Sequence, residues 1–372
     1  MIIAGYEYRG ARPFENVYLT GIVRDKQRRK MSKSLGNSPD PLDLIDQYGA
    51  DGVRVGMLLS SPAGNDLMFD QDLCQQGSGF VNKIWNAFRL VSGWRVSEEV
   101  PQSDSDHKAI EWYTNKFQSA LAEIEDHYGK YRISDALMTT YKLIWDDFCS
   151  WFLEWIKPEY GAAISAKTYA QVIALFEDNL KILHPFVPFV SEEIWQKLSS
   201  RTKDEALIVA SWPELKSPNT DLIQEFEHSK EVVSGIRTLR KDKNISFKET
   251  IDLTINDVAN IGNYYESAII KLCNVALVNY GDVAPEGALS FRVKSNEYYV
   301  PVSGHVDLEQ ERQKLTDELA YTEGFLKSVR GKLSNARFVD NAPEPVVAAE
   351  RQKEADALAK IKTIKAALET LG

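Results

Sequence analysis

Residues 71–199 repeat apolar and aromatic side chains every three or four positions and contain few glycines, which favours helices throughout this stretch. The repeat is clearest at three groups of positions: Phe80, Ile84, Phe88 and Val91; Leu137, Tyr141, Ile144 and Phe148; Ile173, Phe176, Leu180 and Leu183. Side chains at this spacing share one helix face, and several such faces must be buried against one another. We therefore expect a helix bundle with an aromatic interior that includes Trp85, Trp112, Trp145, Trp151, Trp155 and Trp195.

Residues 1–70 show an α/β pattern. The run at 17–23 is apolar, continuous and of strand length, and it leads directly into a basic loop at 24–38. Beyond Pro39 and Pro41 the apolar spacing predicts two short helices broken at Gly49. The loop is thus expected to join a buried strand to a helical segment.

The remaining chain divides into two further patterns. Residues 205–304 predict a small α+β unit, with helices near 221–241 and 258–272 and strands around 251–255, 276–280, 288–293 and 298–302. Residues 305–372 follow seven-residue repeats in two segments separated by Pro343 and Pro345, which predicts an antiparallel coiled-coil hairpin. The fold class is therefore mainly α with α/β parts, in four domains: 1–70, 71–204, 205–304 and 305–372.

Charge and cysteine content limit the possible functions. The 44 Lys and Arg against 54 Asp and Glu give a net charge of -10, so only local basic clusters, at 24–33, 237–248 and 327–337, could attract nucleic acid. Such clusters are often no more than solvated faces. Three distant cysteines and five scattered histidines predict neither disulfides nor a zinc site. No apolar run is long enough for a membrane helix, and we expect a cytoplasmic monomer.

The strongest chemical signal is the string Lys30-Met31-Ser32-Lys33-Ser34, followed by Leu35-Gly36-Asn37. Two ammonium groups and two hydroxyls on one loop can bind a polyphosphate, because the lysines offset its charge and the hydroxyls donate hydrogen bonds. The alternative is a solvated basic loop. A specified five-residue string arises by chance in a chain of this length roughly once in ten thousand, so the match favours function.

This string resembles the KMSKS signature of the class I aminoacyl-tRNA synthetases. The segments around it, at 19–25, 40–45 and 48–54, resemble the valine, isoleucine and leucine subgroup, and those at 82–87 and 184–195 resemble its helical anticodon-binding domain. The terminal hairpin, with segments 332–338 and 342–347, is similar to the arm of valyl-tRNA synthetases, and the cysteine content excludes the terminal zinc cluster of the isoleucine enzymes. The resemblance covers nearly the whole chain.

The resemblance implies an enzyme that joins valine to tRNA(Val) through valyl-adenylate, with ATP as substrate and Mg²⁺ as its expected companion. Residues Lys30, Met31, Ser32, Lys33 and Ser34 would bind ATP, and Lys30 and Lys33 would be the catalytic residues that neutralise departing pyrophosphate. No residue acts as a general base. The chain shows no HIGH-type motif and no editing domain. We therefore expect a C-terminal fragment that is inactive alone. Its first residues would form the last part of a Rossmann-like fold.

Two groups of residues are expected to contact tRNA. Asn82, Trp85, Asn86 and Arg89 would face the anticodon, since an aromatic ring and polar groups can stack on and hydrogen-bond to unstacked bases. Lys327, Arg330, Lys332, Arg337 and Arg351 on the arm would contact phosphates. Two alternatives remain: a stand-alone RNA-binding protein on a synthetase scaffold without catalysis, and a coiled-coil scaffold protein, which would leave the Lys30–Ser34 string unexplained.

Overall fold

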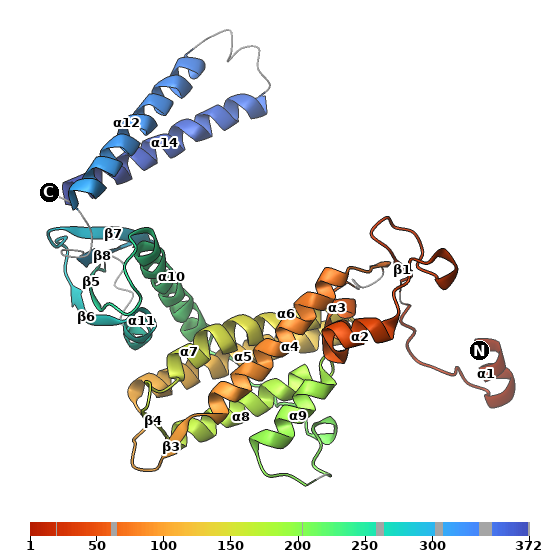
Figure 1. The fold of residues 1–372 in the computed structure, drawn as a ribbon. Coiled ribbons are helices and arrows are strands. Elements are labelled where there is room, and N and C mark those ends of the chain that lie inside the picture. The colour runs from red at the N-terminus through yellow and green to blue at the C-terminus, as the bar shows by residue number, and fades with distance from the viewer. Residues whose placement is uncertain are drawn as a thin grey trace. The chain divides into compact units, whose positions relative to one another are not determined.

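A computed structural model describes residues 1–19, 21–60, 65–202, 204–257, 264–301, 308–334 and 344–370. The chain forms two compact units, Met1–Ile223 and Gln224–Gly372 (Figure 1). The first unit is mostly helical with two small sheets, and the second combines a four-stranded sheet with helices.

The N-terminal part of the first unit carries the loop at 24–38. Its elements are α1 (Ile2–Arg9), β1 (Val23–Arg24), the short 3-10 helix η1 (Lys33–Leu35), α2 (Pro41–Tyr48), α3 (Ala50–Leu59) and β2 (Leu67–Met68). The break expected between two helices at Gly49 is confirmed, and Gly49 takes φ 76° there. This positive φ suits glycine because it has no Cβ to clash.

The buried strand expected over residues 17–23 is wrong. Of the described residues in this run, only Val23 belongs to a strand, and β1 pairs with β2 in parallel over two residues. Val17 and Leu19 are 63% and 78% exposed. An apolar run becomes a buried strand only where neighbouring strands and helices cover its side chains, and the described part of the chain supplies only the short β2 beside it.

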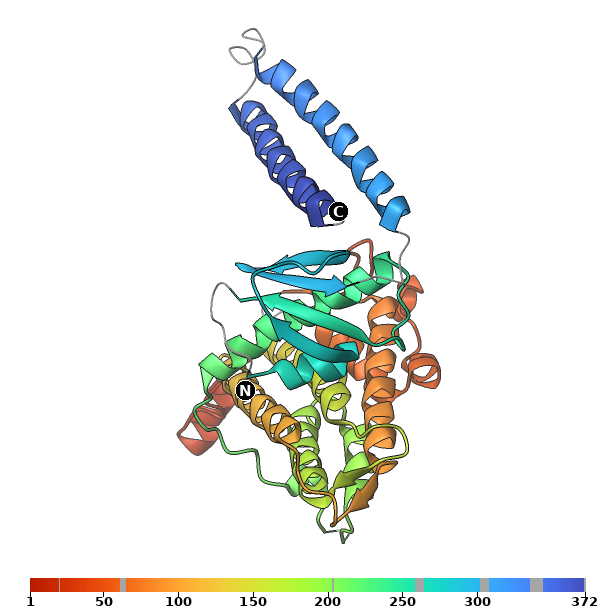
Figure 2. The ribbon, with the colours of Figure 1, turned by 90° about the vertical axis from the view of Figure 1, so that its left-hand side faces the viewer.

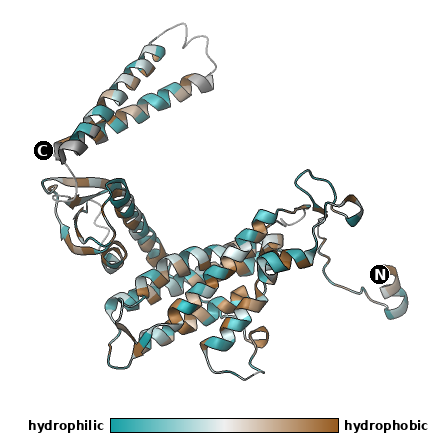
Figure 3. Cartoon of the chain, in the orientation of Figure 1, coloured by the Kyte–Doolittle hydropathy of each residue, from teal (hydrophilic) through white to brown (hydrophobic). Residues whose placement is uncertain are grey.

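The helix bundle expected at 71–199 is confirmed. Its elements are α4 (Gln71–Ser92), α5 (Asp104–Gly129), α6 (Ile133–Lys142), the π-helix η2 (Leu143–Phe152), α7 (Leu153–Ile156), α8 (Ala166–Leu183) and α9 (Pro188–Leu198), with strands β3 (Arg95–Ser97) and β4 (Ala163–Ser165) paired in parallel and a 3-10 turn η3 (Leu207–Val209). Figure 3 shows brown apolar bands alternating with teal along these helices. Trp112, Trp155 and Trp195 are buried as expected, whereas Trp85, Trp145 and Trp151 are only half-buried.

Helix α3 packs against α4 at glycines. A Cβ on Gly77 would lie 2.2 Å from the carbonyl oxygen of Gly52, and one on Gly56 would lie 2.6 Å from the amide nitrogen of Cys74. Such distances are shorter than any real Cβ contact, so the two backbones approach this closely only because side chains are absent. The glycines therefore attach the loop-bearing segment directly to the bundle.

A second contact joins α3 to the turn between α8 and α9. The buried carboxylate of Asp51 accepts hydrogen bonds from the backbone amides of Phe189 and Val190, at 3.3 and 2.7 Å, in the first turn of α9. Arg54 donates to the carbonyl oxygens of Pro185 and Phe186 at 3.0 and 3.2 Å. Asp51 thus serves as a cap for a distant helix, because it satisfies amides that have no partner within α9.

The second unit contains the expected small α+β part. Its elements are α10 (Thr220–Asp242), β5 (Ile251–Asn256), α11 (Glu266–Cys273), β6 (Val275–Tyr280), β7 (Ala288–Val293) and β8 (Asn296–Pro301). The sheet order is β6-β5-β8-β7, with β5 parallel to β6 and the other pairs antiparallel (Figure 2). The second helix starts at Glu266, later than expected, because Tyr264 and Tyr265 form a turn; residues 258–263 lie outside the described chain.

Two long helices follow, α12 (Leu308–Leu333) and α14 (Glu344–Thr370). Ion pairs join Arg330 to Glu354 and Lys360 to Glu318, so low numbers on one helix meet high numbers on the other and the helices run antiparallel. Leu326, Ala357 and Ile361 are buried together with Leu319 packed against them. Pro345 was expected between the helices, but it lies in the first turn of α14, where its missing N–H costs nothing.

Candidate functional site

The string Lys30–Ser34 lies on a short turned-back segment that starts at β1. The amide of Met31 donates to the carbonyl of Val23 at 3.0 Å, and the amide of Asp25 donates to the carbonyl of Arg29 at 2.9 Å. Ser32 then caps η1, because its hydroxyl accepts from the amide of Leu35 at 3.3 Å. We call residues 24–38 the signature loop.

Asp25 and Asn37 lock the signature loop from within. The carboxylate of Asp25 accepts from the amides of Gln27 and Arg29 at 3.0 and 2.9 Å, and from the Asn37 side chain at 3.0 Å. The carboxamide oxygen of Asn37 accepts from the amide of Ser32 at 3.0 Å. The hydrogen bond from Asn37, followed by the hydrogen bonds and charge of Arg29, lowers the pKa of Asp25 to about 2, so the carboxylate is charged at neutral pH.

Asp25 and Asn37 are not among the site residues that the sequence predicts. The only signal was their position just outside the Lys30–Ser34 string. Asp25 is the single acid among the six basic residues of 24–33, and Asn37 closes the Leu35-Gly36-Asn37 extension.

The cations of the loop fall into two classes. Arg24 pairs with Asp66, Lys26 with Asp70 at 2.9 Å, and Arg29 with Asp25 at 2.7 Å. Lys30 and Lys33, like Arg28, are exposed and have no acid within ion-pair distance among the described residues. The structure therefore leaves these two predicted lysines available to a ligand, while their neighbours hold the loop in place.

This arrangement suits an anion with several oxygens. The ammonium groups of Lys30 and Lys33 can offset negative charge, and the hydroxyls of Ser32 and Ser34, 3.1 Å apart, can donate hydrogen bonds. Met31 is half-buried and anchors the backbone rather than offering a polar group.

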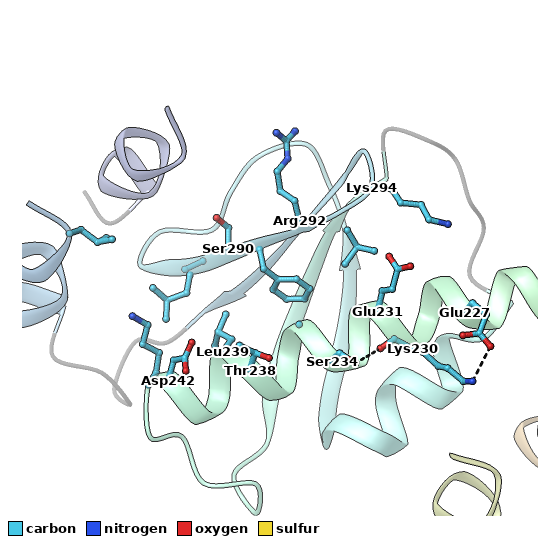
Figure 4. A pocket seen from close by; sticks show the side chains of 17 residues that line it. Glu227, Lys230, Glu231, Ser234, Thr238, Leu239, Asp242, Ser290, Arg292 and Lys294 are labelled. Carbon is cyan, nitrogen blue, oxygen red and sulfur yellow. Dashed lines mark hydrogen bonds and ion pairs between the residues drawn. The ribbon is translucent and has the colours of Figure 1, made fainter. Parts of the chain in front are cut away.

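A cavity lies elsewhere, in the second unit. It is a groove of about 700 Å³ between α10 and the β7–β8 hairpin. Figure 4 shows Glu231, Ser234 and Thr238 along α10, with the hairpin across the groove from them, while Ser290 and Arg292 point away from the helix. The ring of Phe291 fills the space where a Cβ on Gly235 would lie, at 2.4 Å. None of the predicted site residues lines this groove.

The four residues predicted to face the anticodon lie along α4. Asn82, Asn86 and Arg89 are exposed, and Trp85 is half-buried with its ring 5.2 Å from that of Phe88. These positions leave the polar groups accessible, and the anticodon assignment stays a prediction. On the same helix, the ammonium of Lys83 lies 5.4 Å from the centre of the half-buried Trp145 ring on η2.

The cations predicted on the arm differ in their surroundings. Arg330 pairs with Glu354 at 2.7 Å and Lys332 with Glu350 at 3.7 Å, whereas Lys327 and Arg351 are exposed without an ion pair among the described residues. Arg337 lies outside the described residues. Their phosphate contacts also stay predictions.

An aromatic surface on the arm was missed as well. Tyr321 and Phe325, one helical turn apart on α12, are 77% and 42% exposed, outside the packed seam. Their positions outside the seven-residue repeat were the available signal.

Within the described residues, no three His, Cys, Asp or Glu side chains gather at a possible metal site. Cys74, Cys149 and Cys273 are buried free thiols, and burial raises the pKa of Cys149 to about 12, so this thiol stays protonated. None of the described helices combines the length and apolar character that crossing a membrane would require.

Three family models match the chain in succession. Residues 1–70 match "tRNA synthetases class I (I, L, M and V)", residues 111–255 match "Anticodon-binding domain of tRNA ligase", and residues 307–372 match "Valyl tRNA synthetase tRNA binding arm". The chain is 64% identical over 371 residues to the valine--tRNA ligase of Christiangramia forsetii. The chain belongs to the valine–tRNA ligase family.

Two other valine–tRNA ligases are also similar to the chain along its length. Identity is 50% with that of Phocaeicola vulgatus, over all of this chain, and 35% with that of Enterococcus faecalis, over 98% of it. The chain spans 42% of the length of the first two relatives and 43% of the third. A solved ternary complex, "LeuRS-tRNA-LeuAMS" of Agrobacterium radiobacter K84, has a TM-score of 0.43 at 20% identity, covering 60% of this chain and 26% of that one.

The fold agrees at the coarse level with the valine–tRNA ligase family. It is a class I synthetase-like architecture with an anticodon-binding domain, mostly helical with small sheets.

Proposed function

We propose that this chain is the C-terminal part of a valine–tRNA ligase, which attaches valine to tRNA(Val) with ATP through valyl-adenylate. Identity to such ligases along the whole chain supports the proposal. The observation that carries the chemistry is the signature loop, where two unpaired ammonium groups project from a backbone locked by Asp25 and Asn37.

In this proposal the loop acts on pyrophosphate. Adenylate formation breaks the bond between the α- and β-phosphates of ATP, and negative charge grows on the leaving pyrophosphate. Lys30 and Lys33 stabilise that charge, and Ser32 and Ser34 donate hydrogen bonds to its oxygens. Preorganised charges of this kind are worth most when the loop need not rearrange during reaction. Mg²⁺ is expected to accompany ATP, as it usually accompanies phosphates in enzyme sites.

The other segments would bind tRNA. Residues 1–70 end the nucleotide-binding fold, 71–204 form the anticodon-binding domain with Asn82, Trp85, Asn86 and Arg89 toward the anticodon, and 205–304 form a small α+β domain. Residues 305–372 form an antiparallel coiled-coil arm. On the arm, five cations are proposed to contact tRNA phosphates: Lys327, Arg330, Lys332, Arg337 and Arg351. We propose a monomer that works in the cytoplasm. No observation favours a stand-alone RNA-binding protein or a scaffold.

The test measures valine-dependent ATP–pyrophosphate exchange. This chain alone should give only background exchange, because one loop cannot position the α-phosphate. In a full-length ligase that contains this chain, Lys33→Ala should lower the exchange rate by about 10²- to 10³-fold with the KM for valine unchanged, because its partner charge develops in the transition state. Lys26→Ala, on the same loop but paired with Asp70, is the control. Equal losses in rate and valine binding would remove this role from Lys33.

A further inference from the structure

The turn at 244–249, between α10 and β5, presents an aromatic ring to solvent, with one lysine on the turn and another in the last turn of α10. Phe247 is 53% exposed, and Lys241 and Lys248 are exposed too. Neither lysine has an acid within ion-pair distance among the residues that the structure describes. This turn belongs to the second basic cluster of the sequence, at 237–248, and it is separate from both the signature loop and the arm.

The backbone of the turn is held rigidly from inside. Arg240 donates to the carbonyl oxygens of Ser246 and Glu249 at 2.7 and 2.8 Å. Asn274 Nδ2 donates to the three carbonyl oxygens of residues 247–249 at 3.4, 3.1 and 3.1 Å. Four consecutive carbonyl groups therefore point inward, toward two side chains that lie outside the turn.

These contacts do not depend on the Phe247 ring. Arg240 is buried and also donates to the carbonyl of Cys273 at 2.9 Å, so its guanidinium bonds to backbone oxygens. The guanidinium carbon lies 5.7 Å from the centre of the Phe247 ring, close enough for a cation–π contact. Burial of Ile245 anchors the start of the turn. The fold thus holds an exposed ring in a fixed place through hydrogen bonds to the backbone on either side of it.

We propose that this turn binds one unstacked nucleotide of an RNA, with the base on the Phe247 ring and the adjoining phosphates on Lys241 and Lys248. An aromatic face stacks on any base, and ammonium groups beside it pair with the backbone. Asp242 and Glu249 flank the turn, so the contact is limited to one nucleotide rather than a long phosphate track. The proposal rests on the proposed function in one respect, that the RNA is tRNA.

The experiment uses the full chain and a transcript of tRNA(Val), with binding measured by filter retention across a salt series. Phe247→Ala should weaken binding about tenfold, in the range found for removal of one base-stacking residue. Phe247→Trp should restore it, and Phe247→Leu, which is apolar without a π-face, should not. Lys241→Ala with Lys248→Ala should reduce the log–log salt slope by about 0.7 for each lost contact. Leu277, on β6, is exposed to the same extent as Phe247. Leu277→Ala is therefore the control for removing an exposed apolar side chain that is not aromatic.

Ultraviolet cross-linking of the wild-type complex supplies a direct readout, and the cross-link is expected in the peptide 244–248. Binding by Phe247→Ala within twofold of wild type, or cross-links only elsewhere, would overturn the inference and leave the proposed function standing. Failure of the wild-type chain to bind the transcript would overturn both. Circular dichroism melting of each variant shows whether any loss comes from unfolding.

Discussion

Asp25 determines the shape of the signature loop more than either lysine does. Its carboxylate gathers two backbone amides and the Asn37 side chain, and these hydrogen bonds require the charged form. The lysines then extend from a backbone that is already ordered. The loop is therefore expected to be preformed before ATP binds.

The loop should lose this order in acid. Asp25 has a pKa of about 2 in the folded loop, below the value near 3.8 of an unperturbed carboxyl. Its stabilising contribution is therefore complete above about pH 4 and is lost as the pH falls through about 2. The protection of the Arg29 and Ser32 amides from hydrogen exchange, relative to their intrinsic exchange rates, should fall across this range, and in Asp25→Ala it should be low at every pH. Unchanged protection at pH 2 would contradict this account.

At the residue scale, the sequence predicts which side chains could bind a polyphosphate, but not which hydrogen bonds fix the backbone that carries them. The Lys30–Ser34 string is recognisable because its residue types match a polyphosphate. The Asn37–Asp25 hydrogen bond joins positions twelve apart, and it forms only because the chain turns back at Arg28, which takes a φ of 64°. An arginine is not a residue that predicts such a turn. The same holds for Arg240 and Asn274, which come from two elements to fix one turn.

At the scale of elements, the α3–α4 contact depends on glycine. Gly77→Ala should lower the free energy of unfolding of the first unit by about 2–3 kcal/mol, since its Cβ would meet backbone at 2.2 Å. Gly79→Ala lies on the same helix with nothing within 4 Å, and it should instead stabilise by about 0.5–1 kcal/mol. Urea unfolding monitored by tryptophan fluorescence measures both. Equal effects would show that helix propensity, rather than close packing, governs the site.

The Asp51 cap gives a second test at this scale. Asp51→Ala removes two buried hydrogen bonds and should cost about 1–3 kcal/mol. Asp51→Asn should cost less, because it keeps one acceptor and removes a charge whose burial raises the pKa of Asp51.

The raised pKa of Asp51 determines how pH changes the difference in stability between the wild type and Asp51→Asn. The folded state binds the Asp51 proton more tightly than the unfolded state, so wild-type stability falls relative to Asp51→Asn as the pH rises from 4 to 7. A wild-type advantage that grows with pH would contradict the prediction. Chemical unfolding at both pH values provides the comparison.

Periodicity predicts elements well only where the chain supplies its own partners. The bundle helices bury their repeats against one another, and α12 and α14 do so along Leu326 and Ile361. The run at 17–23 has strand composition but lacks neighbouring strands in the described chain, and so it stays exposed. The glycine contacts of α3 and α4 carry no periodic signal, because glycine reads as a helix breaker until its partner helix is known.

At the scale of the whole molecule, only local groups of positive charge can attract RNA. A net charge of -10 repels RNA on average, so binding depends on cations that are not already paired. The arm illustrates this, since residues 307–372 contain 11 basic and 12 acidic residues. Several of the basic side chains are paired across the two helices, which leaves Lys327 and Arg351 as the free cations among the predicted contacts that the structure describes.

Neutralising those two cations should therefore affect tRNA binding more than neutralising two paired ones. Lys327→Ala with Arg351→Ala is expected to weaken tRNA binding about equally for different tRNAs and to lower the log–log salt slope by about one unit for each lost contact. Lys360→Ala with Lys365→Ala removes the same charge from the same arm, but those lysines already pair with Glu318 and Glu323 at 2.7 and 3.0 Å. The paired set should change the slope less. Equal slopes for the two double variants, measured by filter binding over a salt series, would show that the arm attracts tRNA through its total charge rather than through the unpaired cations.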